Sequence, residues 1–240
     1  MAARQPRGLG QYSGVARALE RVGDRWALLI VRDLLAGARR YSDLKLGLPR
    51  IPTNILSDRL RELQEAGVLR RVPAVRGGYE LTAGGRALEA AVLALERWGW
   101  DSLGEPAEGE IVTADSLSFT LRAAFRPEVA RSMPPAEYRL HVAAGDEVPV
   151  LSAAGVPAAD TTTVSVSAVV VDGVLELRAI GADAIAQPAR ALPQPTEVLD
   201  VVVSKAALHE FLANDPSGGA CVDRGDDALL ERFHASFHLP

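Results

Sequence analysis

The sequence is poor in cysteine and has no long apolar run. Its single cysteine, Cys221, excludes an internal disulfide framework and a cysteine-rich zinc site. No stretch of about 18 consecutive apolar residues occurs, so the sequence predicts no membrane span. The basic N-terminus is not followed by an apolar segment, so no secretory signal is expected. A reducing cytoplasm is the simplest compartment for such a chain.

Motifs that indicate catalysis or nucleotide binding are also missing. The sequence contains no P-loop, no G-x-G-x-x-G fingerprint and no G-x-S-x-G nucleophile elbow. His234 and His238 have the i, i+4 spacing that can hold a metal ion on a helix, but no cluster of glutamates or cysteines accompanies them. The sequence therefore predicts that the protein is not an enzyme and that it uses no metal or other cofactor.

The chain divides into two parts of opposite charge. Residues 1–100 hold 17 Lys and Arg against 10 Asp and Glu, a net charge of +7, whereas residues 101–240 hold 9 against 21, a net charge of −12. The basic part could attract a polyanion. Glycines and a proline interrupt a helical pattern close to residue 100. We therefore expect a disordered basic tail at 1–11, a first domain at 12–100, a linker at 101–110 and a second domain at 111–240.

The first domain is predicted to contain short helices followed by a hairpin. Val15, Leu19 and Val22 form the expected apolar stripe of the first helix, and Trp26 is expected in the core. Four polar residues are expected to cap helices: Asp24, Ser42, Thr53 and Thr82. Residues 69–81 are typical of two short strands around a glycine-rich tip. This order of elements is typical of a winged helix-turn-helix domain. It consists of short helices, then a helix with a polar face, a basic hairpin and a final helix.

The helix that begins at residue 53 carries the candidate recognition surface. Leu56, Leu60 and Leu63 share one face, which is expected to be buried. The opposite face is polar, and it is either a solvated surface or a surface that enters the major groove of DNA. Its candidate DNA contacts are Thr53, Asn54, Ser57 and Arg61, and Asp58 is expected to orient Arg61 or to accept from a cytosine amine.

Further basic residues are candidates for contacts with phosphate. For Arg59, a phosphate contact and a salt bridge to a neighbouring glutamate remain alternatives. Arg70 and Arg71 are adjacent on a strand, so only one of them can face DNA. Arg76 at the hairpin tip is favoured over both, and Arg71 stays a candidate. Three more residues could follow the DNA backbone: Arg39, Arg40 and Lys45.

The first domain resembles a known family at the level of motifs. The segments "GDRWALLIVRDLL", "RRYSDL", "NILSDRLRELQEAG" and "YELTAGGRAL" are similar to those of the HxlR family of bacterial transcriptional regulators. This resemblance covers residues 12–99 and implies a winged helix-turn-helix dimer that binds an inverted-repeat operator in double-stranded DNA. Several members sense oxidants through an N-terminal cysteine, but Ser13 precedes "GVARALE" here. The resemblance implies these dimer-interface candidates: Val15, Leu95, Trp98 and Trp100. Core packing remains the favoured alternative for Trp98.

The second domain has the pattern of an α+β fold. Val- and Leu-rich segments predict an antiparallel sheet, Asp172–Gly173 predicts a hairpin turn, and flanking amphipathic segments predict helices on one face of the sheet. The order of elements and the ending "GDDALLERF" resemble sterol-carrier (SCP2-like) domains. That resemblance implies an apolar ligand site, lined by Phe119, Phe125, Leu140, Val166, Phe211, Phe233 and Phe237. The alternative is that these residues fill an ordinary core.

Together these features predict a dimeric transcriptional regulator of the repressor type, whose second domain either responds to a small apolar ligand or mainly builds the dimer. Its expected partners are operator DNA, a second copy and a small hydrophobic ligand, with no membrane. The alternative is a carrier of lipids or other small apolar molecules, in which the winged helix is only a scaffold.

Overall fold

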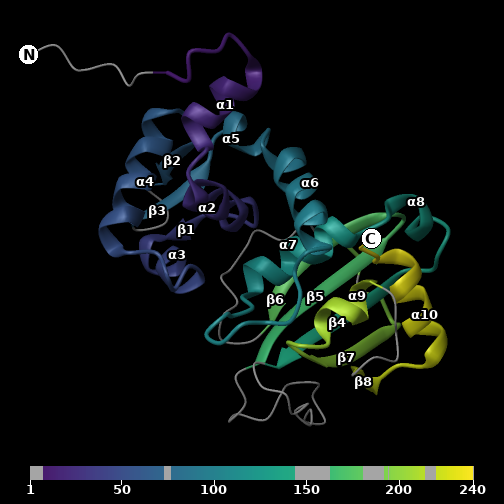
Figure 1. Cartoon of the computed structure of the whole chain (residues 1–240). Coiled ribbons are helices and arrows are strands. Elements are labelled where there is room, and N and C mark those ends of the chain that lie inside the picture. The colour runs from purple at the N-terminus through teal and green to yellow at the C-terminus, as the bar shows by residue number, and fades with distance from the viewer. Residues whose placement is uncertain are drawn as a thin grey trace, which may run out of the picture. The chain divides into compact units, whose positions relative to one another are not determined.

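The computed structural model describes residues 8–72, 77–143, 163–180, 192–193, 195–213 and 220–239. The chain forms two compact units, Met1–Val92 and Leu93–Pro240, which are coloured from purple to yellow in Figure 1. The sequence placed the boundary after Trp100 instead. The structure differs because Leu93 and Trp100 pack with the hydrophobic core of the second unit. No helix in the described part of the chain has the length and hydropathy of a membrane span.

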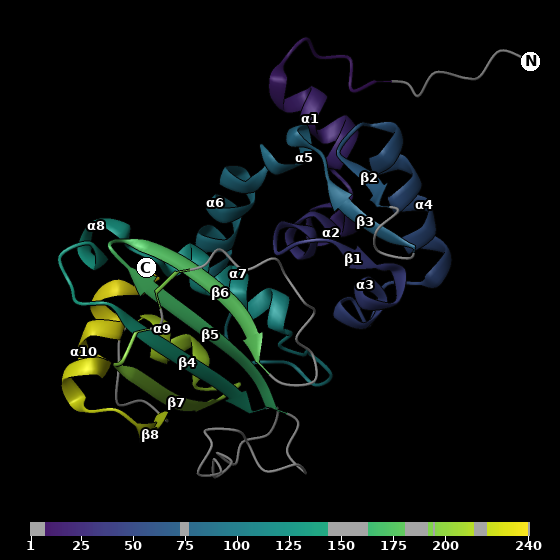
Figure 2. The same cartoon turned by 180° about the vertical axis from the view of Figure 1, so that it is seen from behind.

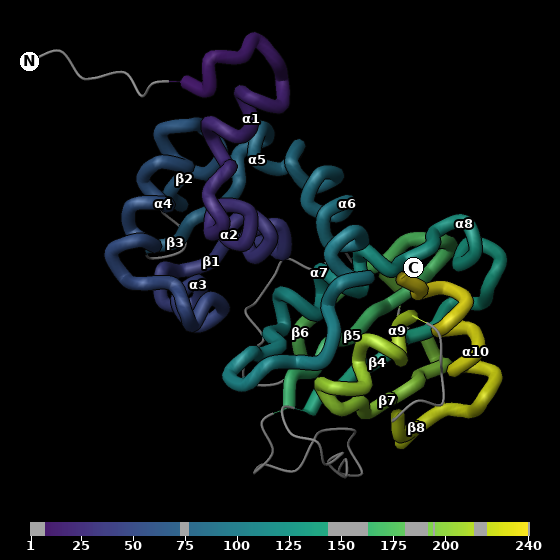
Figure 3. The backbone as a smooth tube through the Cα atoms, viewed as in Figure 1, coloured from purple at the N-terminus to yellow at the C-terminus, as the bar shows by residue number. Residues whose placement is uncertain are grey.

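The first unit contains helices and a small antiparallel sheet in the predicted order (Figure 3). Its elements are α1 (Gly14–Val22), α2 (Arg25–Leu35), β1 (Arg39–Arg40), α3 (Tyr41–Gly47), α4 (Thr53–Glu65), β2 (Leu69–Val72), β3 (Gly78–Leu81) and α5 (Ala83–Arg86). The strands pair in the order β1-β3-β2. The single long helix predicted after Thr82 is divided into α5 and α6 (Glu89–Trp100).

The core of the first unit is built on α2 and α4. Leu56, Leu60 and Leu63 are each at most 2% exposed, which confirms the predicted stripe of α4. The predicted stripe of α1 is wrong, because Val15 and Leu19 are 72% and 53% exposed and only Val22 of the three is buried. Helix α1 instead turns Ala16 and Val22 inward. Trp26, which was expected in the core, is half-buried.

Two of the predicted helix caps are present and two are wrong. Asp24 Oδ1 accepts a hydrogen bond from Trp26 N at 2.9 Å, and Thr82 Oγ1 accepts one from Gly85 N at 3.1 Å. Thr53 instead lies inside α4, which is preceded by Pro52. Ser42 likewise lies inside α3, where Arg40 N donates to Asp43 Oδ2 at 2.8 Å. Pro52 and Arg40 occupy the cap positions, so Thr53 is the first residue of α4 and Ser42 is the second residue of α3.

The second unit combines a five-stranded sheet with helices on one face. After α6 its elements are α7 (Ala114–Ala124), α8 (Pro127–Ala130), β4 (Ala136–Ala143), β5 (Thr163–Val171), β6 (Val174–Ile180), β7 (Val198–Ser204), α9 (Leu208–Ala213), β8 (Ala220–Arg224) and α10 (Asp227–Ser236). Helices α9 and α10 lie in front of the sheet in Figure 1 and behind it in Figure 2. The predicted hairpin turn is confirmed at Asp172 and Gly173, which have φ angles of 52° and 73°.

The sheet is mixed, which corrects the expectation of an antiparallel sheet. The strand order is β6-β5-β4-β7-β8, and β4 pairs with β7 in parallel. The physical reason is the connection between β6 and β7. These strands follow one another in the chain, yet β5 and β4 lie between them, so the chain crosses the sheet and returns in the direction of β4.

The two faces of this sheet differ in chemistry because side chains alternate along each strand. Tyr138 and Leu140 of β4 join the apolar core beneath the helices. Glu137, Arg139 and His141 point to the opposite face. There Arg139 Nε donates to Glu137 Oε1 at 2.8 Å, and Ser167 Oγ donates to the same oxygen at 2.8 Å.

Glu137 links this polar face to the stability of the unit. Burial disfavours the ionised carboxylate, but hydrogen bonds from Arg139 and Ser167 outweigh that effect and lower the pKa of Glu137 from its ordinary value of 4.5. At pH values above the ordinary pKa, the ionised carboxylate therefore makes its full contribution to the stability of the fold. This contribution is lost as the pH falls through the lower pKa of the folded state.

We predict that Glu137→Gln reduces the acid sensitivity of the fold. Thermal unfolding from about pH 7 to about pH 3 should show that wild-type Tm exceeds that of the variant near neutrality and that the gap narrows below the ordinary pKa. Glu231→Gln, which alters an exposed carboxylate of α10, is the matched control and should leave the pH profile unchanged. A gap that stays constant with pH would contradict the role assigned to Glu137.

Candidate nucleic-acid interface

The outer face of α4 presents the side chains that the sequence singled out. Thr53, Asn54, Ser57 and Arg61 are exposed, whereas the leucine stripe on the opposite face is buried. The side chain of Asn54 makes no hydrogen bond with any other residue in the described part of the chain, so its amide is available to a partner. An exposed helix of this kind can enter the major groove of DNA.

Tyr41 fixes the N-terminal end of α4 to α3. Its hydroxyl donates to the carbonyl oxygen of Thr53 at 2.9 Å and lies 3.4 Å from Ser57 Oγ. Ser57 Oγ also donates to the Thr53 carbonyl at 3.1 Å. The role of Tyr41 was not predictable from the sequence, because it depends on how α3 and α4 are placed relative to each other.

Lys45 holds the turn that joins α3 to α4. Its ammonium group donates to the carbonyl oxygens of Pro49 and Ile51, both at 2.9 Å. The sequence made Lys45 a candidate for a contact with the DNA backbone. In the structure its first role is to position the helix that follows.

The arginines of α4 pair with neighbouring carboxylates. Arg59 lies 2.6 Å from Glu62 and 3.8 Å from Asp24 at the start of α2, so the salt-bridge alternative is the one present. Arg61 pairs with Asp58 at 3.0 Å, as expected, while its side chain stays 66% exposed. An exposed ion pair of this kind contributes only about 0–1 kcal/mol, so Arg61 can exchange it for another acceptor.

The arginines outside α4 are not equivalent. Arg39 is only 2% exposed, and its guanidinium donates to the carbonyl oxygen of Ala38, which corrects its assignment as a DNA contact. Arg39 pairs across β1 and β3 with Tyr79, which is also buried. Arg40 is exposed.

The hairpin arginines also differ from one another. Arg70 pairs with Glu80 at 2.6 Å, whereas the exposed Arg71 lies over the ring of Tyr79, 5.5 Å from its centroid. Of the two, Arg71 therefore keeps its charge free of a carboxylate partner among the described residues. Arg76, which the sequence favoured, lies outside the described residues.

The two tryptophans among the interface candidates differ in exposure. Trp98 is 76% exposed, so the expectation of core packing for it is wrong. Trp100 is 4% exposed and stacks on His209 with ring centroids 5.3 Å apart, so it belongs to the core of the second unit and not to a dimer interface. Val15 and Leu95 are 72% and 47% exposed.

Six of the seven candidate ligand-lining residues of the second unit belong to one buried cluster or pack against it. The ring of Phe233 lies between those of Phe211 and Phe237, with centroid distances of 5.4 and 4.9 Å. Phe125 contacts Phe237. Leu140 and Val166 belong to the same buried cluster, and Phe119 is buried at 3% exposure. This packing is that of an ordinary protein core.

The structure also brings together a serine, a histidine and an aspartate that sequence spacing did not reveal. On the polar sheet face, His141 Nδ1 lies 2.8 Å from Ser165 Oγ, and His141 Nε2 lies 3.3 Å from Asp200 Oδ1. His141 and Asp200 are at most 1% exposed. Both ring nitrogens are engaged inside the protein, so the geometry fits a buried polar network and not an open catalytic site.

Cys221, the single cysteine, is exposed on β8. Among the described residues, no group of three or more His, Cys, Asp or Glu side chains is close enough to hold a metal ion.

The helices and hairpin of the first unit define a winged helix-turn-helix domain. Residues 21–106 match the HxlR-like helix-turn-helix family. An HTH-type transcriptional regulator of Mycobacterium tuberculosis is 49% identical over 98 residues, which are 38% of this chain and 60% of that protein. YvaP of Bacillus subtilis, also an HTH-type transcriptional regulator, is 37% identical over 86 residues, which are 34% of this chain and 80% of YvaP. The chain belongs to the HxlR-like helix-turn-helix family.

Several solved structures are similar over this part of the chain. The crystal structure of the HTH-type transcriptional regulator YtcD has 36% sequence identity and a TM-score of 0.35, and it covers 38% of this chain and 97% of its own. The match with the mycobacterial relative spans three fifths of that protein's length.

We predict that Tyr41→Phe destabilises the first unit by about 1 kcal/mol, because the Thr53 carbonyl loses its hydrogen bond from the phenol. Urea unfolding measures this difference. Tyr12→Phe is the matched control, since Tyr12 is fully exposed and should show no change. Equal stabilities of the two variants would contradict the role of Tyr41.

Proposed function

We propose that the protein is a DNA-binding transcriptional regulator, and that α4 is its recognition helix. The observation that carries the proposal is the exposed polar face of α4, with Asn54 and Arg61 directed outward above a buried leucine stripe. Asparagine and arginine are the side chains that best read adenine and guanine edges in the major groove. Family membership supports the proposal, because the curated relatives are named as HTH-type transcriptional regulators.

Phosphate contacts supply the sequence-independent part of the proposed binding. Arg40 and Arg71 are exposed, and a net charge of +7 over residues 1–100 attracts the DNA backbone. The alternative, a carrier of small apolar molecules, has less support. Its candidate lining residues Leu140, Phe211 and Phe233 are at most 2% exposed and fill the core with side chains.

Binding to DNA is tested by fluorescence anisotropy. Labelled DNA from the region upstream of the protein's own gene is compared with a scrambled duplex across a salt series. Tighter binding to the natural duplex, with affinity falling steeply as salt rises, supports the proposal, because released counterions make phosphate contacts salt-dependent. Equal and weak binding to both duplexes, and to a selected pool of random duplexes, overturns it.

We predict that Arg61→Ala weakens binding to the preferred duplex by about 1–3 kcal/mol and relaxes the preference at one base position. Arg71→Ala should weaken all duplexes alike, because a phosphate contact carries no sequence information. Arg131→Ala is a close control: Arg131 also pairs with a carboxylate three residues away, and its side chain is 63% exposed against 66% for Arg61. Equal, sequence-independent losses for Arg61→Ala and Arg71→Ala would show that Arg61 contacts only phosphate.

We further propose that two copies bind an inverted repeat and act as a repressor. The apolar side chains of Val15 and Leu19 on α1, and of Leu95 and Trp98 on α6, are each 47–76% exposed, which is typical of an interface between chains. Two-fold symmetry in the protein matches two-fold symmetry in the operator. Deletion of the gene should raise transcription from its target promoter in a reporter assay, and a fall would indicate activation.

We predict that Val15→Glu shifts the protein towards the monomer in sedimentation equilibrium, because a carboxylate in an apolar interface loses its hydration. Val222→Glu is the control, since Val222 is exposed on β8. At the same concentration, Val15→Glu should have a lower weight-average molecular mass than Val222→Glu. Identical masses would remove α1 from the interface.

A further inference from the structure

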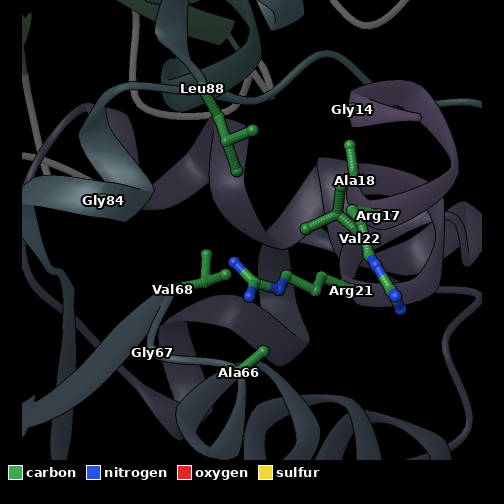
Figure 4. Close-up of a pocket in the computed structure, with 10 residues that line it drawn as sticks. All are labelled: Gly14, Arg17, Ala18, Arg21, Val22, Ala66, Gly67, Val68, Gly84 and Leu88. Carbon is green, nitrogen blue, oxygen red and sulfur yellow. The ribbon is translucent and has the colours of Figure 1, made fainter. Parts of the chain in front are cut away.

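The first unit contains a pocket on the side of α1 that faces the end of α4. It has a volume of about 300 Å³, which is at the lower end of the range for small-molecule sites. Figure 4 shows its lining residues, which are Gly14, Arg17, Ala18, Arg21, Val22, Ala66, Gly67, Val68, Gly84 and Leu88. They come from α1, the turn between α4 and β2, α5 and the residues after α5.

The wall of this pocket is mostly apolar. Val22 and Val68 are 7% and 6% exposed, and Leu88 is half-buried. Gly14 and Gly67 contribute no side chain, and a Cβ atom on either would meet nothing within 4 Å. An apolar body of a few carbon atoms can therefore replace water here with a gain in free energy.

Arg21 is exposed and brings a positive charge to the lining of this pocket, where it also attracts the Glu20 carboxylate. Its guanidinium makes no hydrogen bond and no salt bridge with any described residue, and Figure 4 shows the side chain crossing the pocket towards Val68. The nearby carboxylate of Glu20 is already committed: it accepts from Leu9 N at 2.8 Å and pairs with Arg17 at 2.7 Å.

These contacts also favour the ionised state of Glu20. The hydrogen bond from the Leu9 backbone, followed by that from Arg17, lowers the pKa of the Glu20 carboxyl. Glu20 therefore remains paired with Leu9 and Arg17, and Arg21 keeps its full donor capacity towards the pocket.

We propose that this pocket binds small monocarboxylates with a compact apolar body, and that Arg21 pairs with the carboxylate. The planar guanidinium can donate two parallel hydrogen bonds to a carboxylate, and such charge-assisted pairs are stronger than neutral ones. The apolar body then contacts Val22, Val68 and Leu88. This binding does not depend on the proposed recognition of DNA.

The place of the pocket gives such a ligand a route to regulation, and this step rests on the proposed function. Ala66, Gly67 and Val68 directly follow the recognition helix. An occupant that favours one position of this turn relative to α1 changes the population of the binding-competent arrangement of α4.

The test uses benzoate as the probe and benzyl alcohol as its uncharged counterpart, each titrated into the full chain by calorimetry. Benzoate should bind at one site per chain, at least about tenfold more tightly than benzyl alcohol. Arg21→Gln should remove this advantage, and Ala18→Leu, which fills the pocket from the exposed surface of α1, should abolish binding of both. Arg25→Gln is the control and should retain the advantage, because Arg25 is an exposed arginine of the same unit that does not line the pocket.

Three results would overturn the proposal: no heat of binding up to on the order of 10 mM benzoate, equal affinities for the two probes, or benzoate binding that survives both Arg21→Gln and Ala18→Leu. Circular dichroism of each variant separates loss of binding from loss of fold. DNA affinity is measured separately on the ligand-free protein, so failure of ligand binding and failure of DNA recognition are distinguishable.

Discussion

The burial of Leu56, Leu60 and Leu63 is the constraint on which the candidate interface depends. A helix is a rigid cylinder, so burying one stripe fixes its rotation and directs Asn54 and Arg61 to solvent. Each buried leucine contributes about 1.5–3 kcal/mol, whereas an exposed ion pair such as Arg61–Asp58 contributes about 0–1 kcal/mol. The apolar stripe therefore sets the orientation of α4, and the charges on its outer face remain free to serve binding.

Features set by neighbouring residues were predictable from the sequence, and features set by distant partners were not. The stripe of α4, the cap at Asp24 and the turn at Asp172–Gly173 follow local patterns. Arginine is usually exposed, and the burial of Arg39 beside the paired strand β3 does not follow from its neighbours in the sequence. Trp100 is buried against His209, 109 residues further along the chain. The outer face of α4 was likewise predictable, whereas its anchor Tyr41 required the geometry between two helices.

The register of the strands in the second unit is specified by the chemical difference between the two faces of the sheet. Tyr138 and Leu140 pack under the helices, whereas Glu137 and His141 form a polar network on the other side. Because side chains alternate, a slip of one residue in β4 would place a carboxylate and an imidazole among the phenylalanines. That arrangement would bury unpaired polar groups at high cost. The polar network therefore specifies the register of the central strand as strongly as the apolar core does.

The residues that hold α4 in place are different from those that face outward, and the anchors bind to main-chain atoms. Tyr41 contacts the carbonyl oxygen of Thr53, and Lys45 contacts those of Pro49 and Ile51. Every amino acid has a carbonyl oxygen, so these contacts do not depend on the identity of the outward side chains. Duplicated copies of such a gene can therefore exchange residues at Asn54 and Arg61 while the scaffold folds as before. The DNA sequence that such copies prefer can then change without loss of the fold, and only selection for new binding sites limits that change.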